Sequence, residues 1–362
     1  MFFDPFSSFG MENKVRQSNF EILRILAMAI LVVQHAVYWQ NFSFEPNFIM
    51  NKFFCDIVHC IRSVGTNIFI LIAGYFLPTT TFKWKKLVLL ILQLYLFFYG
   101  CRIVTIMLTK APIDTYEFSS WFFPVLQNQW WFVSAYILVY ILIPFLQKLV
   151  FQMNKKEFEF LICSQILIWS VFPTIFFPII GQSTDFMNFY NRYTFMILLY
   201  LTGAYLRLYG FSVFKTAKKS LAVFVTTMAA IVFIVFLSVF LDIESTIRCW
   251  STNSLFALIL SISLFCFFKN LNIGHHPKIN RIAATMLGVY LLHEGPFRHN
   301  IWHKLFVFVG HETDPFLFAR ILFAVVVVML TGIIVELCRQ PFEKYVSKFL
   351  DKITAKFFKN LV

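Results

Sequence analysis

Long apolar segments recur along the whole chain, and each is about as long as a helix that crosses a lipid bilayer. A spanning helix needs about 20 predominantly apolar residues, because each residue adds about 1.5 Å toward a hydrocarbon core of about 30 Å. Ten segments of the 362-residue chain approach this length and composition. We therefore predict an all-α bundle of about ten transmembrane helices. The predicted spans are 20–40, 57–77, 86–108, 130–151, 158–180, 193–210, 220–241, 251–268, 280–297 and 316–338.

The composition excludes an ordinary soluble domain. Hydrophobic residues make up 59% of the chain and charged residues only 14%, with a mean hydropathy of +0.73. Soluble domains average about 45–50% apolar and about 25% charged residues. No Gly- or Ser-rich linker divides the chain. We predict a single membrane domain, residues 20–338, between a cytoplasmic N-terminal tail, 1–19, and a basic cytoplasmic tail, 339–362.

The net charge of +13 does not indicate a nucleic-acid partner, because the basic residues lie in short clusters between apolar segments. With ten spans, 21 of the 31 Lys and Arg fall on the side that carries both termini. They gather at 83–86, 148–156, 207–219 and 269–281 and in the C-terminal tail. Cytoplasmic loops carry such an excess of basic residues. We expect a multi-pass protein of the inner (cytoplasmic) membrane of the cell, with both termini in the cytoplasm.

The C-terminal tail has a pattern of its own. Its sequence "PFEKYVSKFLDKITAKFFKNLV" repeats apolar residues at helical spacing with lysines between them. A helix of this kind lies along the bilayer surface and is attracted to anionic lipids. We predict an amphipathic anchor on the inner leaflet, which makes the lipid bilayer an expected partner.

The first span carries ionisable residues that membrane helices rarely keep. In "NFEILRILAMAILVVQHAVYW", residues 19–39, Glu21 and Arg24 lie near the cytoplasmic end and His35 lies in the outer half. Helical geometry places Arg24 and His35 about 20° apart around the axis and about 16 Å apart along it. Intramembrane charges usually mark a pathway or an active site. A Glu–Arg pair at a helix end and a histidine bonded to a neighbouring helix would explain the same residues without a function.

Polar residues at matching depths in other spans favour a functional cavity. His293 and Glu294 lie toward the outer end of the ninth span, in "GVYLLHEGP". We expect them to lie near an outward-facing cavity that spans two, three, four and ten also line. Trp130 and Trp131 would equally suit an aromatic belt at the membrane interface. The loop histidines lack the spacing of a metal site, so none is predicted. The expected cavity residues are Arg62, Thr66, Asn67, Arg102, Trp130, Trp131 and Arg320.

These residue types fit two kinds of membrane protein. A histidine can take a proton from a hydroxyl and return it later, while Arg24 and the inner-loop lysines suit an anionic ligand such as a phosphate. A transferase could take an activated donor inside and deliver its group outside. A proton-coupled transporter of a glycan or an acylated intermediate uses similar residues, although the two halves of the chain show no evident repeat. A structural or sensory role would leave Arg24 and His35 unexplained.

Several segments, in their order along the chain, resemble the acyltransferase-3 family of bacterial membrane O-acyltransferases. The resemblance rests first on Arg24-x10-His35 within "FEILRILAMAILVVQHA" and on "NIFILIAGYFL", residues 67–77. Two later segments, "WWFVSAYILVYILIPFL" and "MLGVYLLHE", support it. It covers most of residues 18–338 and includes the number of spans. One departure is Ala73, where many relatives have Ser before the Gly.

The resemblance implies transfer of an acyl group, most often acetyl from acetyl-CoA, to a hydroxyl of a cell-surface polysaccharide or its lipid-linked precursor. O-succinyl transfer to an exopolysaccharide is an alternative. By matching position, His35 is expected to be the general base, and Arg24 with Glu21 to bind the donor. His293 and Glu294 are further catalytic candidates. The expected partners are acyl-CoA and a carbohydrate acceptor, with no bound cofactor and no metal, and the sequence leaves the oligomeric state open.

Overall fold

The chain folds as a bundle of helices. The computed structural model describes residues 17–40, 42, 49–110, 121–125, 129–175, 192–241, 252–308 and 310–359. No strand occurs among them, so the prediction of an all-α fold is confirmed. Most of the predicted N-terminal tail, residues 1–16, and the last three residues lie outside the described part of the chain.

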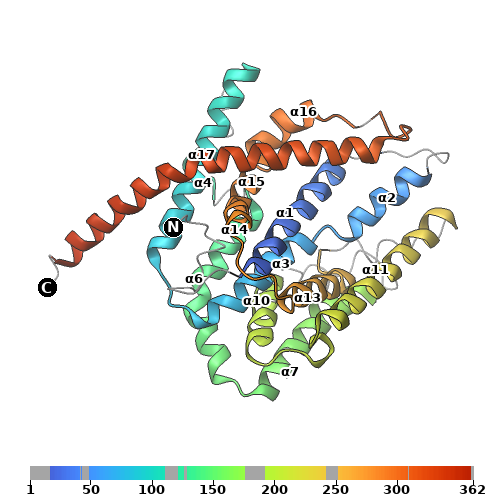
Figure 1. The fold of residues 1–362 in the computed structure, drawn as a ribbon, viewed down its shortest axis with the longest axis horizontal. Coiled ribbons are helices and arrows are strands. Elements are labelled where there is room, and N and C mark those ends of the chain that lie inside the picture. The colour runs from blue at the N-terminus through green and yellow to red at the C-terminus, as the bar shows by residue number, and fades with distance from the viewer. Residues whose placement is uncertain are drawn as a thin grey trace.

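Helices occur in the described part of each of the ten predicted spans, although residues 176–180 of the fifth span lie outside that part (Figure 1). The longer helices are α1 (Ser18–Tyr38), α4 (Trp84–Thr109), α6 (Trp131–Gln152), α11 (Ala217–Phe240) and α17 (Leu317–Lys359). The shorter helices are α2 (Ile49–Cys60), α3 (Val64–Phe76), α7 (Lys155–Ile166), α10 (Arg192–Leu208), α13 (Leu255–Lys269), α14 (Pro277–Ala283), α15 (Met286–His293) and α16 (His303–Leu305). Short 3-10 or π turns are η2 (Leu77–Thr79), η4 (Leu167–Val171), η5 (Ser212–Phe214) and η6 (Arg298–Trp302).

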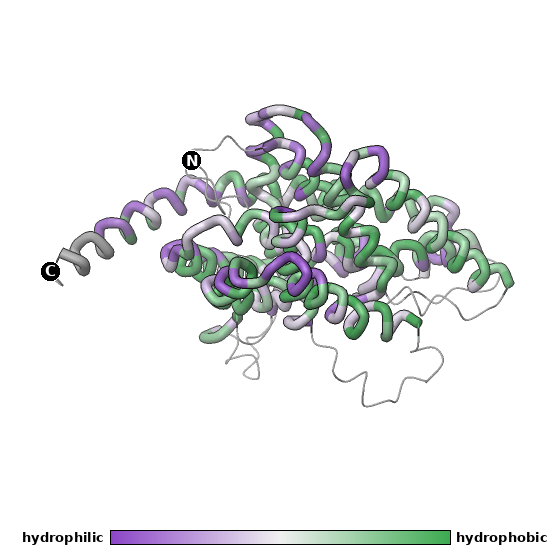
Figure 2. Tube along the Cα trace, turned by 90° about the horizontal axis from the view of Figure 1, so that it is seen from below, coloured by the Kyte–Doolittle hydropathy of each residue, from purple (hydrophilic) through white to green (hydrophobic). Residues whose placement is uncertain are grey.

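The outer helices consist largely of hydrophobic residues, as Figure 2 shows, and many of their large apolar side chains are exposed. Phe145, Phe233 and Phe323 are 60–66% exposed. Apolar surface of this extent suits hydrocarbon rather than water. The chain is therefore a membrane protein. Seven helical stretches in the described part are long and apolar enough to cross a bilayer: Ser18–Tyr38, Met50–Thr79, Trp84–Thr109, Trp131–Gln152, Lys155–Ile175, Ala217–Phe240 and Leu317–Lys352.

Glycine residues bring the central helices into backbone contact. A Cβ atom at Gly74 of α3 would overlap the carbonyl oxygen of Tyr200 on α10, and one at Gly203 would overlap the carbonyl oxygen of Leu71. Gly65 makes a similar contact between α3 and Ala27 of α1. Small residues allow this close approach, which gains dispersion energy where no hydrophobic effect drives helices together. α3 is thereby held between α1 and α10.

The second predicted span, 57–77, is two helices rather than one. The chain breaks at residues 61–63 between α2 and α3. The carbonyl oxygen of Ser63 accepts hydrogen bonds from the Asn67 N–H and the Thr66 hydroxyl, both at 2.9 Å. Non-helical backbone at membrane depth is tolerated where it lines a cavity or is bonded internally. The ninth span, 280–297, is similarly divided into α14 and α15.

The last span and the tail form one continuous helix, so the predicted boundary at residue 338 falls inside α17. Its 43 residues extend about 65 Å, about twice the thickness of the hydrocarbon core. The C-terminal part projects beyond the other helices and is richer in polar residues (Figures 1 and 2). The helix continues through Pro341, and on either side of that residue Arg339 pairs with Glu336 at 2.7 Å and with Glu343.

Replacing Gly74 by Ala is expected to destabilise the protein, because the added methyl group meets backbone that cannot rotate away. Overpacking of this kind costs about 1–3 kcal/mol. Gly100→Ala on α4 is the matched control, since nothing lies within 4 Å of a Cβ atom there. Thermal unfolding of both variants in detergent measures the difference. Equal unfolding temperatures for the two variants would contradict the backbone contact.

Candidate active site

Two histidines and a glutamate from distant parts of the chain meet inside the bundle. Nδ1 of His35 on α1 lies 2.9 Å from Nε2 of His293 at the end of α15. The same nitrogen lies 3.0 Å from Oε1 of Glu294. All three residues are at most 9% exposed. The structure thus brings together three residues that the sequence places at one depth in two separate spans.

The hydrogen bonds assign a proton to one nitrogen of each imidazole. Nδ1 of His293 lies 2.8 Å from the carbonyl oxygen of Val289, which can only accept, so Nδ1 carries the proton. Nε2 of a neutral His293 is then an acceptor. Nδ1 of His35 faces this nitrogen and the Glu294 carboxylate, so it carries a proton too. Nε2 of His35 remains as the basic nitrogen, and no described residue forms a hydrogen bond to it.

Gly295, which has a left-handed backbone conformation, lies directly after the end of α15 and its cap residue Glu294. Gly295 has φ of +66°, a backbone region that residues with a side chain rarely adopt. A Cβ atom at Gly295 would lie 2.7 Å from the ring of Trp130. Successive residues of a helix point about 100° apart. Because the helix stops, His293 and Glu294 both reach His35.

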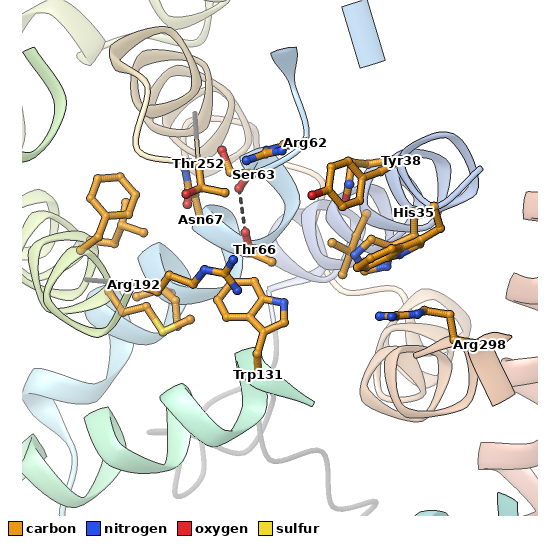
Figure 3. A pocket seen from close by; sticks show the side chains of 17 residues that line it. His35, Tyr38, Arg62, Ser63, Thr66, Asn67, Trp131, Arg192, Thr252 and Arg298 are labelled. Carbon is orange, nitrogen blue, oxygen red and sulfur yellow. Dashed lines mark hydrogen bonds between the residues drawn. The ribbon is translucent and has the colours of Figure 1, made fainter. Parts of the chain in front are cut away.

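A cavity of about 150 Å³ opens beside His35 (Figure 3). Four of the predicted cavity residues, Arg62, Thr66, Asn67 and Trp131, line it. They come from the α2–α3 break, from α3 and from the start of α6, so the interruption in the second span forms part of the wall. The lining side chains are Leu31, Gln34, His35, Tyr38, Trp39, Arg62, Ser63, Thr66, Asn67, Ile70, Trp131, Arg192, Phe195, Met196, Leu199, Thr252 and Arg298.

Three other residues that the sequence predicts for the cavity are not among its lining side chains. Trp130 is 1% exposed and packs against α15, where its Nε1–H donates to the carbonyl oxygen of Leu291 at 3.2 Å. Arg102 lies on α4 with its guanidinium over a phenylalanine of the same helix. Arg320 forms an exposed ion pair with Asp314 at 2.7 Å. Depth along a span predicts none of these orientations, because it does not tell which face of a helix points inward.

Two arginines of the cavity wall, Arg192 and Arg298, are not among the residues that the sequence predicts for the site. By sequence, both are basic residues of outer loops. Nη1 of Arg298 donates to Oε2 of Glu294 at 3.1 Å, and its guanidinium carbon lies 3.6 Å from the centre of the Trp39 ring. The spacing of four residues between Glu294 and Arg298 is the signal that points to this pair.

A second, smaller cavity of about 50 Å³ lies against the same histidine. It shares His35, Trp39 and Arg298 with the larger cavity. The rest of its wall is mostly apolar and comes from α1, α15, the η6–α16 segment and α17. The additional lining residues are Val32, Ala36, Gln40, His293, Trp302, His303, Phe306, Phe308, Ala324, Val325 and Val328.

The predicted donor residues form a buried ion pair about three turns from His35 along α1. Nη1 of Arg24 lies 2.8 Å and 3.0 Å from the two carboxylate oxygens of Glu21. The residues are 3% and 4% exposed. The start of α1 is tied to α14, since the Ser18 hydroxyl donates to the side-chain oxygen of Asn280 at 2.8 Å. Arg24 is thus far from the His35 cluster and has a carboxylate partner within its own helix.

The cluster also contains donor groups that bind divalent metals. Ligand atoms of His35, His293 and Glu294 lie within 4.8 Å of one another. Two imidazoles and a carboxylate are common ligands of Zn²⁺ and Fe²⁺. The direct hydrogen bond between the imidazoles accounts for the positions of both rings. The same geometry therefore serves a proton-transfer site.

A family comparison decides the class of the protein. The family model described as an acyltransferase domain, that of the acyltransferase-3 family, matches residues 17–335 and so covers most of the chain. The chain belongs to the acyltransferase-3 family. The resemblance predicted from its segments is confirmed, and the His35 cluster and both cavities lie within the acyltransferase domain. No curated protein and no solved structure matches the chain.

In this acyltransferase, Glu294→Gln is expected to lower kcat about 100-fold or more. The variant keeps the shape of the side chain but removes the negative charge beside His35, and acid–base catalysis contributes about 10²–10⁴-fold. Glu312→Gln is the matched control, because Glu312 is a second buried acid outside the cluster. The measurement is kcat for acyl transfer at saturating donor. Equal kcat values for the two variants would show that the charge of Glu294 has no part in the reaction.

Proposed function

We propose that this protein is an O-acyltransferase of the inner (cytoplasmic) membrane that uses acetyl-CoA from the cytoplasm. The acceptor is a hydroxyl of a cell-surface polysaccharide or of its lipid-linked precursor. The observation that carries the proposal is the cluster of His35, His293 and Glu294 beside a polar cavity, within an acyltransferase domain.

In the proposed reaction, Nε2 of His35 accepts the proton of the acceptor hydroxyl. The hydroxyl oxygen attacks the thioester carbonyl carbon, and a new C–O bond forms. The C–S bond then breaks, and the sulfur of CoA leaves with the proton that His35 returns. One proton is taken and one is given back, so His35 ends the cycle as it began.

The neighbours of His35 support this role. Once protonated, His35 is an imidazolium 3.0 Å from the Glu294 carboxylate, which stabilises the positive charge. Nε2 of His293 accepts a hydrogen bond from Nδ1–H of His35, which leaves Nε2 of His35 as the nitrogen that can take a proton. Arg298 in turn holds the second oxygen of Glu294 at 3.1 Å. A base oriented by a second group is the arrangement that activates hydroxyl nucleophiles in acyl transfer.

The proposed topology has ten spans and places both termini in the cytoplasm. Three of the spans are the shorter helices α10, α13 and the α14–α15 pair. Their side chains include Leu198, Phe265 and Val289, which are fully buried, so these helices need not match the full bilayer thickness against lipid. The excess of basic residues on the side of the termini supports this orientation. The His35 cavity then lies toward the outer face, and Arg24 lies toward the cytoplasm.

On the donor side, we assign Arg24 and Glu21 to acyl-CoA. A guanidinium suits the phosphates of CoA because it donates paired hydrogen bonds in one plane. Glu21 neutralises Arg24 in the absence of donor, since a buried unpaired charge is costly. In this proposal the donor phosphates replace the carboxylate of Glu21 as the partner of Arg24.

The smaller cavity supports a short, uncharged acyl group. Its volume of about 50 Å³ compares with the about 10–15 Å³ of cavity space that one water needs. Most of the side chains around it, such as Val32 and Val328, are apolar, and Arg298, which also lines it, already donates to Glu294. We therefore propose acetyl rather than succinyl as the group transferred.

Replacing His35 by Ala is expected to abolish transfer without preventing insertion and folding. The assay uses purified protein in liposomes, radiolabelled acetyl-CoA on the cytoplasmic face and a mixed pool of glycan acceptors. General-base loss predicts a fall of about 10²–10⁴-fold in the rate. His311→Ala, an exposed histidine outside the cluster, is the matched control. Full activity of the His35 variant would remove the proposed mechanism, and acyl-independent movement of the glycan would favour a transporter.

Variants of the Glu21–Arg24 pair distinguish a role of Arg24 in donor binding from a role in stability. The single variant leaves Glu21 as an unpaired buried charge and is expected to cost about 3–5 kcal/mol of stability. The double variant Glu21→Gln with Arg24→Gln is expected to recover stability. If Arg24 binds the donor, the double variant keeps a KM for acetyl-CoA raised about tenfold or more. A normal KM in the stable double variant would assign the pair to structure alone.

A further inference from the structure

One N–H group of the buried cluster faces two acceptors. Nδ1 of His35 lies 2.9 Å from Nε2 of His293 and 3.0 Å from Oε1 of Glu294. A neutral imidazole nitrogen carries a single proton, so Nδ1 cannot donate well to both. Oε1 of Glu294 is a buried atom to which no described residue donates a hydrogen bond of ordinary geometry. Three polar atoms thus meet with one proton to share.

The spacing of these three atoms is close to that of the ligands of one zinc ion. Zn²⁺ binds imidazole nitrogens and carboxylate oxygens at about 2.0–2.2 Å in a tetrahedral arrangement, so two of its ligand atoms lie about 3.3 Å apart. The separations of 2.9 Å and 3.0 Å at Nδ1 of His35 are a few tenths of an ångström shorter. All three atoms lie within 4.8 Å of one another. Small side-chain shifts suffice to arrange them around one ion.

The neighbours of the cluster orient two of the three atoms as metal sites require. Nδ1–H of His293 donates to the carbonyl oxygen of Val289 at 2.8 Å, which leaves Nε2 as a lone-pair donor. Histidines that bind zinc commonly donate their other ring N–H to a carbonyl group in this way. Arg298 donates to Oε2 of Glu294 at 3.1 Å, and Oε1 lies on the side of His35. The carboxylate of Glu294 offsets the positive charge that Arg298 brings near the ion.

We infer that the cluster is a binding site for Zn²⁺, and that the bound ion inhibits acyl transfer. The ligands are Nδ1 of His35, Nε2 of His293 and Oε1 of Glu294, and water takes the fourth position. Two imidazoles and a carboxylate are ligand types that suit zinc. The ion reaches the site from the cavities, because His35 lines both of them. The inhibition rests on the proposed function, whereas the binding does not.

Inhibition follows from the proton of the His35 ring. Zn²⁺ takes the lone pair of Nδ1, so Nδ1 gives up its proton. A neutral imidazole still holds one proton, which now lies on Nε2 after exchange with water, and the site gains or loses no proton overall. Nε2 is the nitrogen that accepts the proton of the acceptor hydroxyl in the proposed reaction. With zinc on Nδ1 that nitrogen has no free lone pair, and the base is blocked.

Metal binding is measured on the full chain without acyl-CoA or a glycan. The purified protein in lipid nanodiscs is dialysed to equilibrium against Zn²⁺, and X-ray absorption of the loaded protein identifies the ligands. We expect nitrogen and oxygen ligands at about 2.0–2.2 Å, and no sulfur at about 2.3 Å. The spectrum matters because Cys163 and Cys338 are exposed thiols. Zinc is also expected to raise the unfolding temperature, since it binds the folded chain.

Variants place the ion in the cluster. His293→Gln and Glu294→Gln are each expected to weaken zinc binding about 100-fold or more, because the loss of an outer hydrogen-bond partner alone weakens metal sites about 10–100-fold. The double variant His275→Ala with His276→Ala is the matched control, since these two adjacent histidines are exposed and lie outside the cluster. Its affinity for zinc is expected to equal that of the unmodified protein.

Two outcomes would overturn the binding site. One is an affinity that both His293→Gln and Glu294→Gln leave unchanged, and the other is a spectrum dominated by sulfur ligands. The spectrum is recorded on the unmodified protein, so it decides the question even if a variant does not fold.

The liposome assay tests the inhibition. Saturating Zn²⁺ is expected to lower the rate of acyl transfer at least about tenfold, EDTA to restore it, and EDTA alone to leave it unchanged. A full rate at saturating zinc would overturn the inhibition, as would a loss of activity in EDTA that zinc reverses. Absence of transfer by the metal-free protein would count against the proposed function, whereas the dialysis and the spectrum would still decide the metal site. The two proposals therefore fail separately.

Discussion

The neutralisation of buried charge is the constraint on which this structure depends. Ionisable side chains inside a bundle of apolar helices are costly unless a partner of opposite sign lies beside them. Glu21 meets Arg24 within α1, Glu294 meets His35 and Arg298, and Glu336 meets Arg339. Two of these pairings are local to one helix. The pairing of Glu294 with His35 joins α1 to α15, and it is the one that builds a site.

The helix α1 connects the parts of the molecule that the proposed reaction needs. Its first turns carry the Glu21–Arg24 pair, and its last turn carries His35 and Tyr38. Gly65 of α3 packs against its backbone, so α1 cannot shift without disturbing α3. The distance between the two ends of α1 is therefore set by a rigid element. Such an element suits a reaction whose two substrates arrive from opposite sides of a membrane.

The sequence predicts the class of the fold well and the site in part. Long apolar segments and their basic flanks predict an all-helical membrane protein, because length and hydropathy are properties of each segment alone. Depth along a span also selects His35, His293 and Glu294, since residues at one depth can meet. The sequence does not indicate which face of a helix points inward, so it includes Arg102 and Arg320 and omits Arg192. The break at residues 61–63 contains neither Pro nor Gly, so the local sequence pattern does not reveal it.

The shared wall between the two cavities has a consequence for inhibition. His35, Trp39 and Arg298 face both spaces, so only one layer of side chains separates the proposed acetyl pocket from the proposed acceptor pocket. A single compound that links a small apolar group to a sugar mimic would occupy both spaces at once. Binding of one half would raise the effective concentration of the other half at its pocket. Compounds built on this plan would compete with donor and acceptor together, and the linker would have to pass the ring of Trp39.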